Sequence, residues 1–288
     1  MELIYRKMPP DFTIVDSSCW HSGASNCHKE GIRELIDKVR SRKDYFLGFK
    51  GDAIECILPD DKRYKSAAID LSMMTPQKQA AWLKDILRPI ASQILFWQLG
   101  NHEYHILNTI DIALDISESL GVPYGGLMCK FVAVKDNGEI GFKWMSMHGS
   151  RCLPKGAKDP LQRKANRQAA LKRILEETGH ADCIYMSQGH DHSALFAVAP
   201  TITDEVSLID DGESFKDFKH PAPPQNSRII PSDARWYGIA GSLRKTIAPP
   251  GTHVIDYAEL KGYGPSPLGW LEVTVENYQI VDIKAVKL

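Results

Sequence analysis

Short apolar runs alternate along the chain with longer segments in which apolar residues recur every three or four positions. Five runs have the length and composition of β-strands: residues 12–15, 45–49, 94–99, 142–147 and 183–187. Between them lie four amphipathic helical patterns: residues 28–39, 76–91, 108–120 and 161–178. In the first of these, Ile32, Leu35 and Val39 share one helix face. The alternation predicts a layered α/β architecture rather than a helical bundle or a β-barrel.

The last third of the chain has a different pattern. Residues 201–233 contain the acidic run Asp210-Asp211-Gly212-Glu213 and a proline-rich stretch from His220 to Pro224. Such composition is typical of irregular surface segments, so we interpret 201–233 as an excursion or lid. Apolar runs at 236–241 and 270–286 predict closing strands over 236–288 that return to the same layers. We therefore expect a single domain over residues 1–288.

Composition narrows the class of protein without naming a function. With 43% hydrophobic and 25% charged residues, the chain is that of an ordered globular protein. It shows neither a signal-peptide pattern nor an apolar run of about 18 residues, so we expect a cytoplasmic protein with no membrane contact. Six cysteines occur without a CxxC pair, which argues against a disulfide framework and against a structural zinc knuckle.

Candidate metal ligands follow each of the five predicted strands. They are Cys19 and His21, then Asp52, then Asn101 with His102, then His148, and finally His190 and His192. In open α/β sheets the carboxyl ends of the strands form a common crevice, so side chains distant in sequence can converge there. One carboxylate can bridge two cations, and Asp52 is the candidate. Imidazole and amide groups complete the coordination without adding charge.

Four of these motifs, taken in order, resemble those of the calcineurin-like metallophosphoesterase superfamily. They are Gly51-Asp52, Gly100-Asn101-His102-Glu103, His148-Gly149 and Gly189-His190-Asp191-His192. The resemblance covers roughly residues 12–196. Three pieces of the tail resemble a bacterial and phage branch of undefined substrate: Gly241-Ser242-Leu243, Tyr257-Ala258-Glu259 and Pro265-Ser266-Pro267-Leu268-Gly269.

The resemblance implies a four-layer α/β/β/α sandwich with two divalent cations, manganese, zinc or iron, at one edge. It assigns His21 and His192 to the first cation, with Asp52 shared by both. Asn101, His148 and His190 would hold the second cation. His102 would lie beside the phosphate as the catalytic residue. A hydroxide bridging the two cations would then attack phosphorus.

One position departs from the family pattern. The family begins with Asp-x-His, in which the aspartate binds the first cation, whereas an ungapped reading of this chain places Cys19 there. Cys19 would ligate as a thiolate, which favours zinc or iron over manganese. Alternatively, Asp16 reaches the cation if the loop bulges. A third interpretation is a weak, degenerate first site, in which case the protein works with one tightly held ion or does not work at all.

A basic segment bears on the substrate. Residues 151–173 contain eight Lys and Arg residues and one acid, a local net charge of +7. Beside the site, this segment would attract a polyanion such as nucleic acid, and Arg151 and Lys155 are the nearest candidates for substrate binding. The alternative interpretation is a solvated helix face.

These observations favour a phosphodiesterase, with nucleic acid among its candidate substrates and hence a nuclease as one form of the hypothesis. A phosphomonoesterase or a nucleotide or protein phosphatase is the alternative within the same chemistry. A metal-binding scaffold with weakened catalysis is an alternative of another class. In a third hypothesis, the 201–233 excursion or the basic helix recognises another protein.

Overall fold

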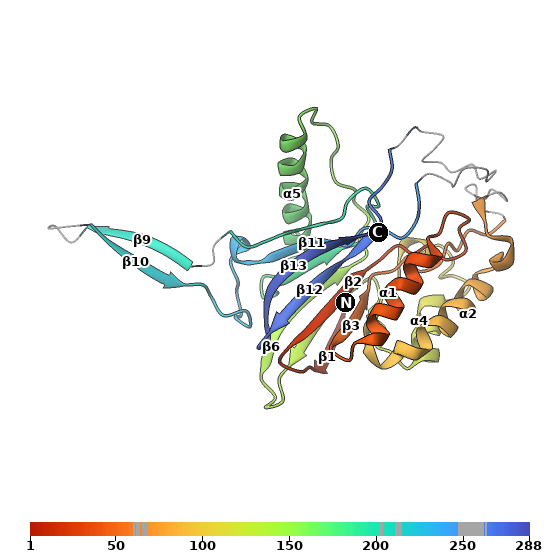
Figure 1. Ribbon diagram of the computed structural model, residues 1–288, viewed down its shortest axis with the longest axis horizontal. Helices are drawn as coiled ribbons and strands as arrows, with labels where there is room; N and C mark the ends of the chain where they lie inside the picture. Colours follow the sequence, from red (N-terminus) through yellow and green to blue (C-terminus); the bar gives the residue numbers. More distant parts are fainter. Residues whose placement is uncertain are drawn as a thin grey trace.

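Two β-sheets packed face to face form the middle of the molecule (Figure 1). The computed structural model describes the chain except residues 60, 62–63, 65–67, 202–203, 211–214, 247–261 and 263, and for 204–210 and 215–221 it gives the backbone. The five-stranded sheet has the order β13-β12-β2-β3-β4. Its strands are β2 (Phe12–Ser17), β3 (Tyr45–Phe49), β4 (Ile94–Trp97), β12 (Gly269–Glu276) and β13 (Gln279–Lys287).

The six-stranded sheet has the order β1-β5-β6-β7-β11-β8. Its strands are β1 (Glu2–Lys7), β5 (Met128–Val134), β6 (Ile140–Met147), β7 (Tyr185–Gln188), β8 (Phe196–Val198) and β11 (Trp236–Ile239). In the five-stranded sheet, β2, β3 and β4 run parallel, and in the six-stranded sheet β6, β7 and β11 do. The carboxyl ends of each parallel set therefore lie at one edge of their sheet.

Helices cover both outer faces of the sandwich. The five-stranded sheet is covered by α1 (Lys29–Ser41), α2 (Pro76–Leu87) and α4 (Ile112–Leu120), and the six-stranded sheet by α5 (Pro160–Glu176). Short helical turns complete the connections: η2 (Leu71–Met73), η3 (Arg88–Gln93), α3 (Asn101–Tyr104) and η4 (Ser232–Ala234). The predicted four-layer α/β/β/α architecture is confirmed.

Three apolar cores separate the layers. In β2, Ile14 belongs to the core between the sheets and Val15 to the core under α1, because successive strand residues point to opposite faces. Both are fully buried. A sheet buried on both faces needs nearly continuous apolar strands. Short apolar runs in the sequence therefore predicted strands of this kind.

The predicted elements are present, with shifts at their ends. The helix expected from residue 108 begins at Ile112, because the Asp111 side chain accepts the N–H of Leu114 and caps it. The helix expected to reach residue 91 ends at Leu87 and continues as a 3-10 turn containing Pro89, which lacks the N–H that an α-helix requires. Strands β1, β5 and β8 were not predicted. β1 and β8 are edge strands with mainly exposed or half-buried residues, whereas β5 lies inside the sheet and its apolar run was missed.

The tail contains a separate two-stranded sheet. Strands β9 (Asp204–Asp210) and β10 (Phe215–Pro221) pair antiparallel, and Figure 1 shows this hairpin standing out from the sandwich. Beyond it, β11 joins the six-stranded sheet, and β12 and β13 join the five-stranded one. Most of the acidic run and the Tyr257-Ala258-Glu259 piece lie outside the described residues. Among the helices that are described, none is long and apolar enough to cross a lipid bilayer.

Candidate metal centre

Five strand ends bring the predicted ligands together at one edge of the sandwich. Within the described residues, two sets of ligating atoms each lie within 4.8 Å of one another. The first set is Cys19, His21, Asp52 and His192, and the second is Asp52, His148 and His190. Asp52 is common to both, as the sequence motifs predict for a bridging carboxylate.

In the first set the ring nitrogens face one another. His21 Nε2 lies 3.0 Å from His192 Nε2 and 3.7 Å from Asp52 Oδ2. Ser18 Oγ donates to Cys19 Sγ at 3.4 Å. Cys19 is fully buried, and its sulfur lies near the ligating atoms of His21, Asp52 and His192. Sulfur, nitrogen and carboxylate oxygen make up a donor set suited to zinc or iron.

In the second set two histidines converge on one amide. His148 Nε2 and His190 Nδ1 each lie 2.9 Å from Asn101 Oδ1. His148 Nε2 also lies 3.2 Å from Asp52 Oδ2. Asn101 Oδ1 therefore lies between the rings of His148 and His190.

The remote nitrogens of three rings are held by hydrogen bonds. His21 Nδ1 donates to Glu55 Oε2 at 2.8 Å. His148 Nδ1 donates to the Lys50 carbonyl at 2.7 Å, and His102 Nδ1 to the Glu55 carbonyl at 2.6 Å. These contacts fix the tautomers, so that in the neutral rings of His21 and His148 the Nε2 lone pairs point into the site.

The Nε2 atoms of His21 and His148 lie 3.7 Å and 3.2 Å from Asp52 Oδ2, so positive charge placed between these acceptors would stabilise the arrangement. For His148, burial would lower the pKa, but the charge of Asp52 outweighs it and raises the pKa. A proton and a metal ion are thus alternative cations between His148 and Asp52. The residues present fit divalent cations, and Asp52 is the candidate ligand that the two sets have in common.

The electrostatics keep most other rings neutral. Burial lowers the pKa of His21 to about 4 and that of His192 well below its usual value. Burial would raise the pKa of Asp52, but the charges of His148 and His102 hold it well below the usual range. Neutral imidazole and ionised carboxylate are the forms that bind metal.

Backbone strain is concentrated at the same residues. Cys19, His21, Asp52 and His190 adopt φ values of 55°, 49°, 53° and 65°. The left-handed region costs a non-glycine residue on the order of 1–2 kcal/mol. A Cβ on Gly100 would lie 2.1 Å from Asp52 N, so only glycine lets the Asp52 and Asn101 loops approach this closely. Strain of this kind clusters at functional sites.

Glu103 supports these loops from beneath. Its buried carboxylate accepts backbone N–H groups of Asp52 at 3.0 Å, Ile54 at 3.1 Å and Gly100 at 3.0 Å. Glu103 belongs to the Gly100-Asn101-His102-Glu103 motif, but its role could not be predicted from the sequence.

Asp16 and Cys19 have separate environments. Asp16 lies inside β2, where it forms an ion pair with Lys50 and accepts the Tyr185 hydroxyl at 2.6 Å. Among the described residues it belongs to neither ligand set. Cys19 belongs to the first set, and burial together with the charge of Asp52 raises the pKa of its thiol well above the usual value. Metal binding stabilises the thiolate that such an environment otherwise disfavours.

His102 lies next to the first set. Its ring packs edge to face on His21, with the two centroids 4.6 Å apart, and its backbone N–H donates to Asp52 Oδ1 at 2.9 Å. His21, Glu55 and His102 form a third set of close ligating atoms.

Glu55 and Arg244 were missed by sequence reasoning. Arg244 Nη1 lies 3.5 Å from Glu55 Oε1, and Arg244 Nε donates to Asn26 Oδ1 at 3.2 Å. Burial would raise the pKa of Glu55, but Arg244 and the His21 hydrogen bond lower it to about 2. The only sequence signals were the short spacing from Asp52 to Glu55 and the position of Arg244 directly after Gly241-Ser242-Leu243.

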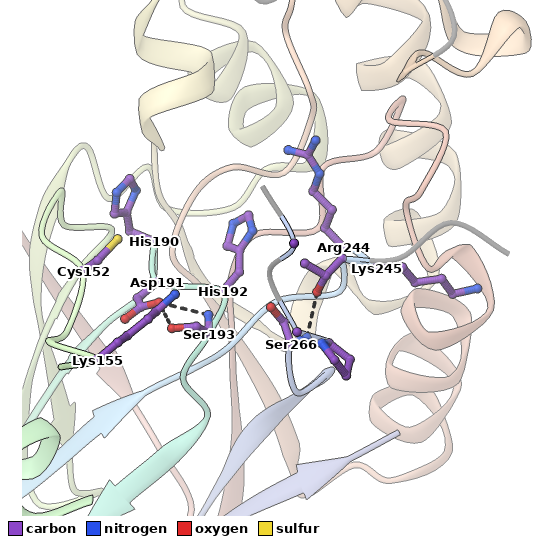
Figure 2. Close-up of a pocket in the computed structure, with 13 residues that line it drawn as sticks. Cys152, Lys155, His190, Asp191, His192, Ser193, Arg244, Lys245 and Ser266 are labelled. Carbon is purple, nitrogen blue, oxygen red and sulfur yellow. Dashed lines mark hydrogen bonds between the residues drawn. The ribbon is translucent and has the colours of Figure 1, made fainter. Parts of the chain in front are cut away.

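A pocket of about 470 Å³ opens beside His190 and His192. Its lining also includes Lys155, Arg244 and Asp191. Figure 2 shows Lys155 extending along the pocket toward Ser193, with the two histidine rings and Arg244 pointing to the same side. Asp191 is engaged by the N–H groups of Leu153 and Ser193. The pocket wall therefore combines ligand histidines with cationic side chains.

The two predicted substrate-binding residues are separated. Lys155 lines this pocket, whereas Arg151 is exposed, pairs with Glu177 and lines a different hollow with Gly149 and Thr178.

Comparison with known proteins gives little guidance. No family model and no curated protein sequence matches the chain. Among solved structures, it is similar to the NAD nucleotidase NadN of Haemophilus influenzae, with 12% sequence identity and a TM-score of 0.38. The match covers 98% of this chain and 50% of that one, so this chain spans about half the length of the nucleotidase. The function has to follow from the side chains of the site.

Replacement of Glu103 by glutamine should destabilise the fold by about 2–3 kcal/mol, because an amide nitrogen would face a backbone N–H that the carboxylate now accepts. Urea unfolding of the metal-free protein measures the change. Glu118→Gln, on the exposed surface of α4, should alter stability by less than about 0.5 kcal/mol. Equal urea concentrations at the unfolding midpoint for Glu103→Gln and Glu118→Gln would show that Glu103 does not support the loops.

Proposed function

We propose that this chain is a dinuclear metal-dependent phosphoester hydrolase. The observation that carries the proposal is the pair of ligand sets sharing Asp52, each drawn from loops of both sheets. The ordered motifs of the calcineurin-like superfamily support the same chemistry. When bound, two divalent cations would activate water as the nucleophile and offset charge on the phosphoryl oxygens.

The ligand assignment follows the geometry. Cys19, His21 and His192 would hold the first cation, and Asn101, His148 and His190 the second, with Asp52 between them. Asp16 is a weaker candidate than Cys19, because its carboxylate is already engaged by Lys50 and Tyr185. A thiolate ligand favours zinc or iron over manganese at the first position.

His102 is the proposed catalytic acid. Its Nδ1 is committed to the Glu55 carbonyl, so Nε2 is the atom that can meet a substrate. In the protonated ring, Nε2 can donate to the leaving oxygen as the phosphorus–oxygen bond breaks. The packing of His102 on His21 keeps it beside the ligand atoms.

Arg244 is the proposed anchor for the phosphoryl oxygens. Glu55 and Asn26 hold its guanidinium, and the side chain lines the pocket beside His192. A guanidinium that is held in place can bind phosphate through directed, charge-assisted hydrogen bonds.

The favoured substrate is a phosphodiester with further negative charge near the scissile phosphate, and nucleic acid is the leading example. The cationic pocket supports this choice, as do the exposed Lys158, Arg163 and Lys164 in the basic segment. Part of the local charge is compensated, since Arg167 lies 3.7 Å from Asp191 and Lys172 lies 3.2 Å from Asp233. A small phosphomonoester would use the ligand sets without these outer cations.

Protein loaded separately with manganese, zinc and iron should hydrolyse bis(p-nitrophenyl) phosphate with at least one metal. Asp52→Asn removes the shared charge and His102→Ala removes the proton donor, so each should lower kcat by at least about a hundredfold. The matched controls Asp136→Asn and His105→Ala change exposed residues and should retain activity. Activity that resists chelators and both site changes would refute the hydrolase. Tight metal binding without turnover would favour the scaffold instead.

Lys155→Ala should raise KM for a single-stranded oligonucleotide severalfold and reduce the slope of log KM against log salt by about one, because one phosphate contact is lost. Lys43→Ala removes the same charge from an exposed position before β3 and serves as the control. Steady-state kinetics over a range of salt concentrations measures both variants. An unchanged slope for Lys155→Ala would exclude the pocket as the polyanion site.

A further inference from the structure

A polar network is buried between the two sheets, directly beneath the candidate metal centre. Lys50 and Asp16 are both fully buried and form an ion pair. The Tyr185 hydroxyl donates to Asp16 Oδ2 at 2.6 Å, and Lys50 Nζ donates to Ser187 Oγ at 3.3 Å. Trp144 Nε1 donates to the same Ser187 hydroxyl at 2.8 Å.

The network joins one sheet to the other. Asp16 belongs to β2 and Lys50 directly follows β3, both in the five-stranded sheet. Tyr185 and Ser187 belong to β7 in the six-stranded sheet. The elements that surround these polar groups contribute apolar side chains to the core between the sheets.

Every strand in the network leads into a candidate ligand. Cys19 and His21 follow β2, Asp52 follows β3, His148 follows β6, and His190 with His192 follows β7. Lys50 also contacts a candidate ligand directly, because its backbone carbonyl accepts a hydrogen bond from His148 Nδ1 at 2.7 Å. Each ligand set takes side chains from both sheets. A small slide of one sheet over the other would therefore disturb both sets.

Stability alone does not explain a buried ion pair in this position. Desolvation opposes burial of the two charges, and apolar residues of similar volume are often equally stable or more stable there. Apolar packing is non-directional, whereas hydrogen bonds and an ion pair are directional and restrict how the groups that they join can be arranged. The network thus specifies the relative position of the sheets.

We propose that Asp16, Lys50 and Tyr185 form an inter-sheet clamp that holds the two ligand sets in register for metal binding. The inference rests on the proposed function. It makes the three members of the clamp positioning residues and gives Asp16 a role other than direct ligation.

The test replaces the inter-sheet clamp by apolar residues in the triple variant Asp16→Val/Lys50→Met/Tyr185→Phe. Metal-free variant and wild-type proteins are compared by urea unfolding, and both are titrated with Co(II), with dissociation constants and visible spectra as readouts. We expect a metal-free variant at least as stable as wild type, with Co(II) bound about ten- to hundredfold more weakly. Its ligand-field spectrum should also change. Loss of affinity without loss of stability separates positioning from a structural role.

Two further variants keep the test decisive. Tyr185→Phe removes a single hydroxyl and should weaken Co(II) binding less than the triple variant does, which gives a result even if the triple variant does not fold. Leu83→Met, a conservative change in the core under α2, should leave affinity and spectrum as in wild type. Wild-type protein that binds Co(II) while the folded clamp variants bind it equally well would overturn the inter-sheet clamp alone. Wild-type protein that binds no Co(II) would overturn the proposed function together with it.

Discussion

The arrangement of this edge of the molecule depends on the Asp52 carboxylate. It accepts the His102 N–H through one oxygen, while the other lies within 3.7 Å of ring nitrogens of both His21 and His148. A buried carboxylate approached by imidazole lone pairs is stable only when positive charge lies between them. The glycines and the Glu103 carboxylate hold the strained loops in this geometry. Under the proposed function, this arrangement would hold cations before a substrate binds.

The two halves of the site differ in chemistry. The second set offers only nitrogen and oxygen, whereas the first includes the Cys19 sulfur. Soft sulfur and hard oxygen prefer different metals, so the two positions favour unequal occupancy by a given ion. Asp16 lies deeper in the same strand, where its charge is compensated by Lys50. Among the described residues, Cys19 thus lies with the candidate ligands, whereas the neighbouring Asp16 is engaged in the interior.

Sequence patterns predicted most of the strands that are buried on both faces, because such strands are short and nearly continuous in apolar residues. The interior strand β5 was missed, because Lys130 interrupts its apolar run. The edge strand β1 escaped this rule, since its exposed side chains resemble those of a loop. The sequence could predict which candidate ligands lie close together, because each of them follows a strand within a short motif. Glu55 and Arg244 were not, because their contacts join residues far apart in the chain. Arg151 and Lys155 line different hollows within a segment, 151–157, that forms neither helix nor strand, so no periodic pattern could predict their separation.

Crystals of the metal-loaded protein, measured by anomalous diffraction at the zinc, iron and manganese absorption edges, test the central claim most directly. The account predicts two anomalous peaks that share Asp52, one of them bonded to Cys19, His21 and His192 and the other to Asn101, His148 and His190. A single peak, or two peaks with Cys19 unbonded, would contradict the assignment of the first half. Absence of any peak at these ligands would contradict the metal centre itself.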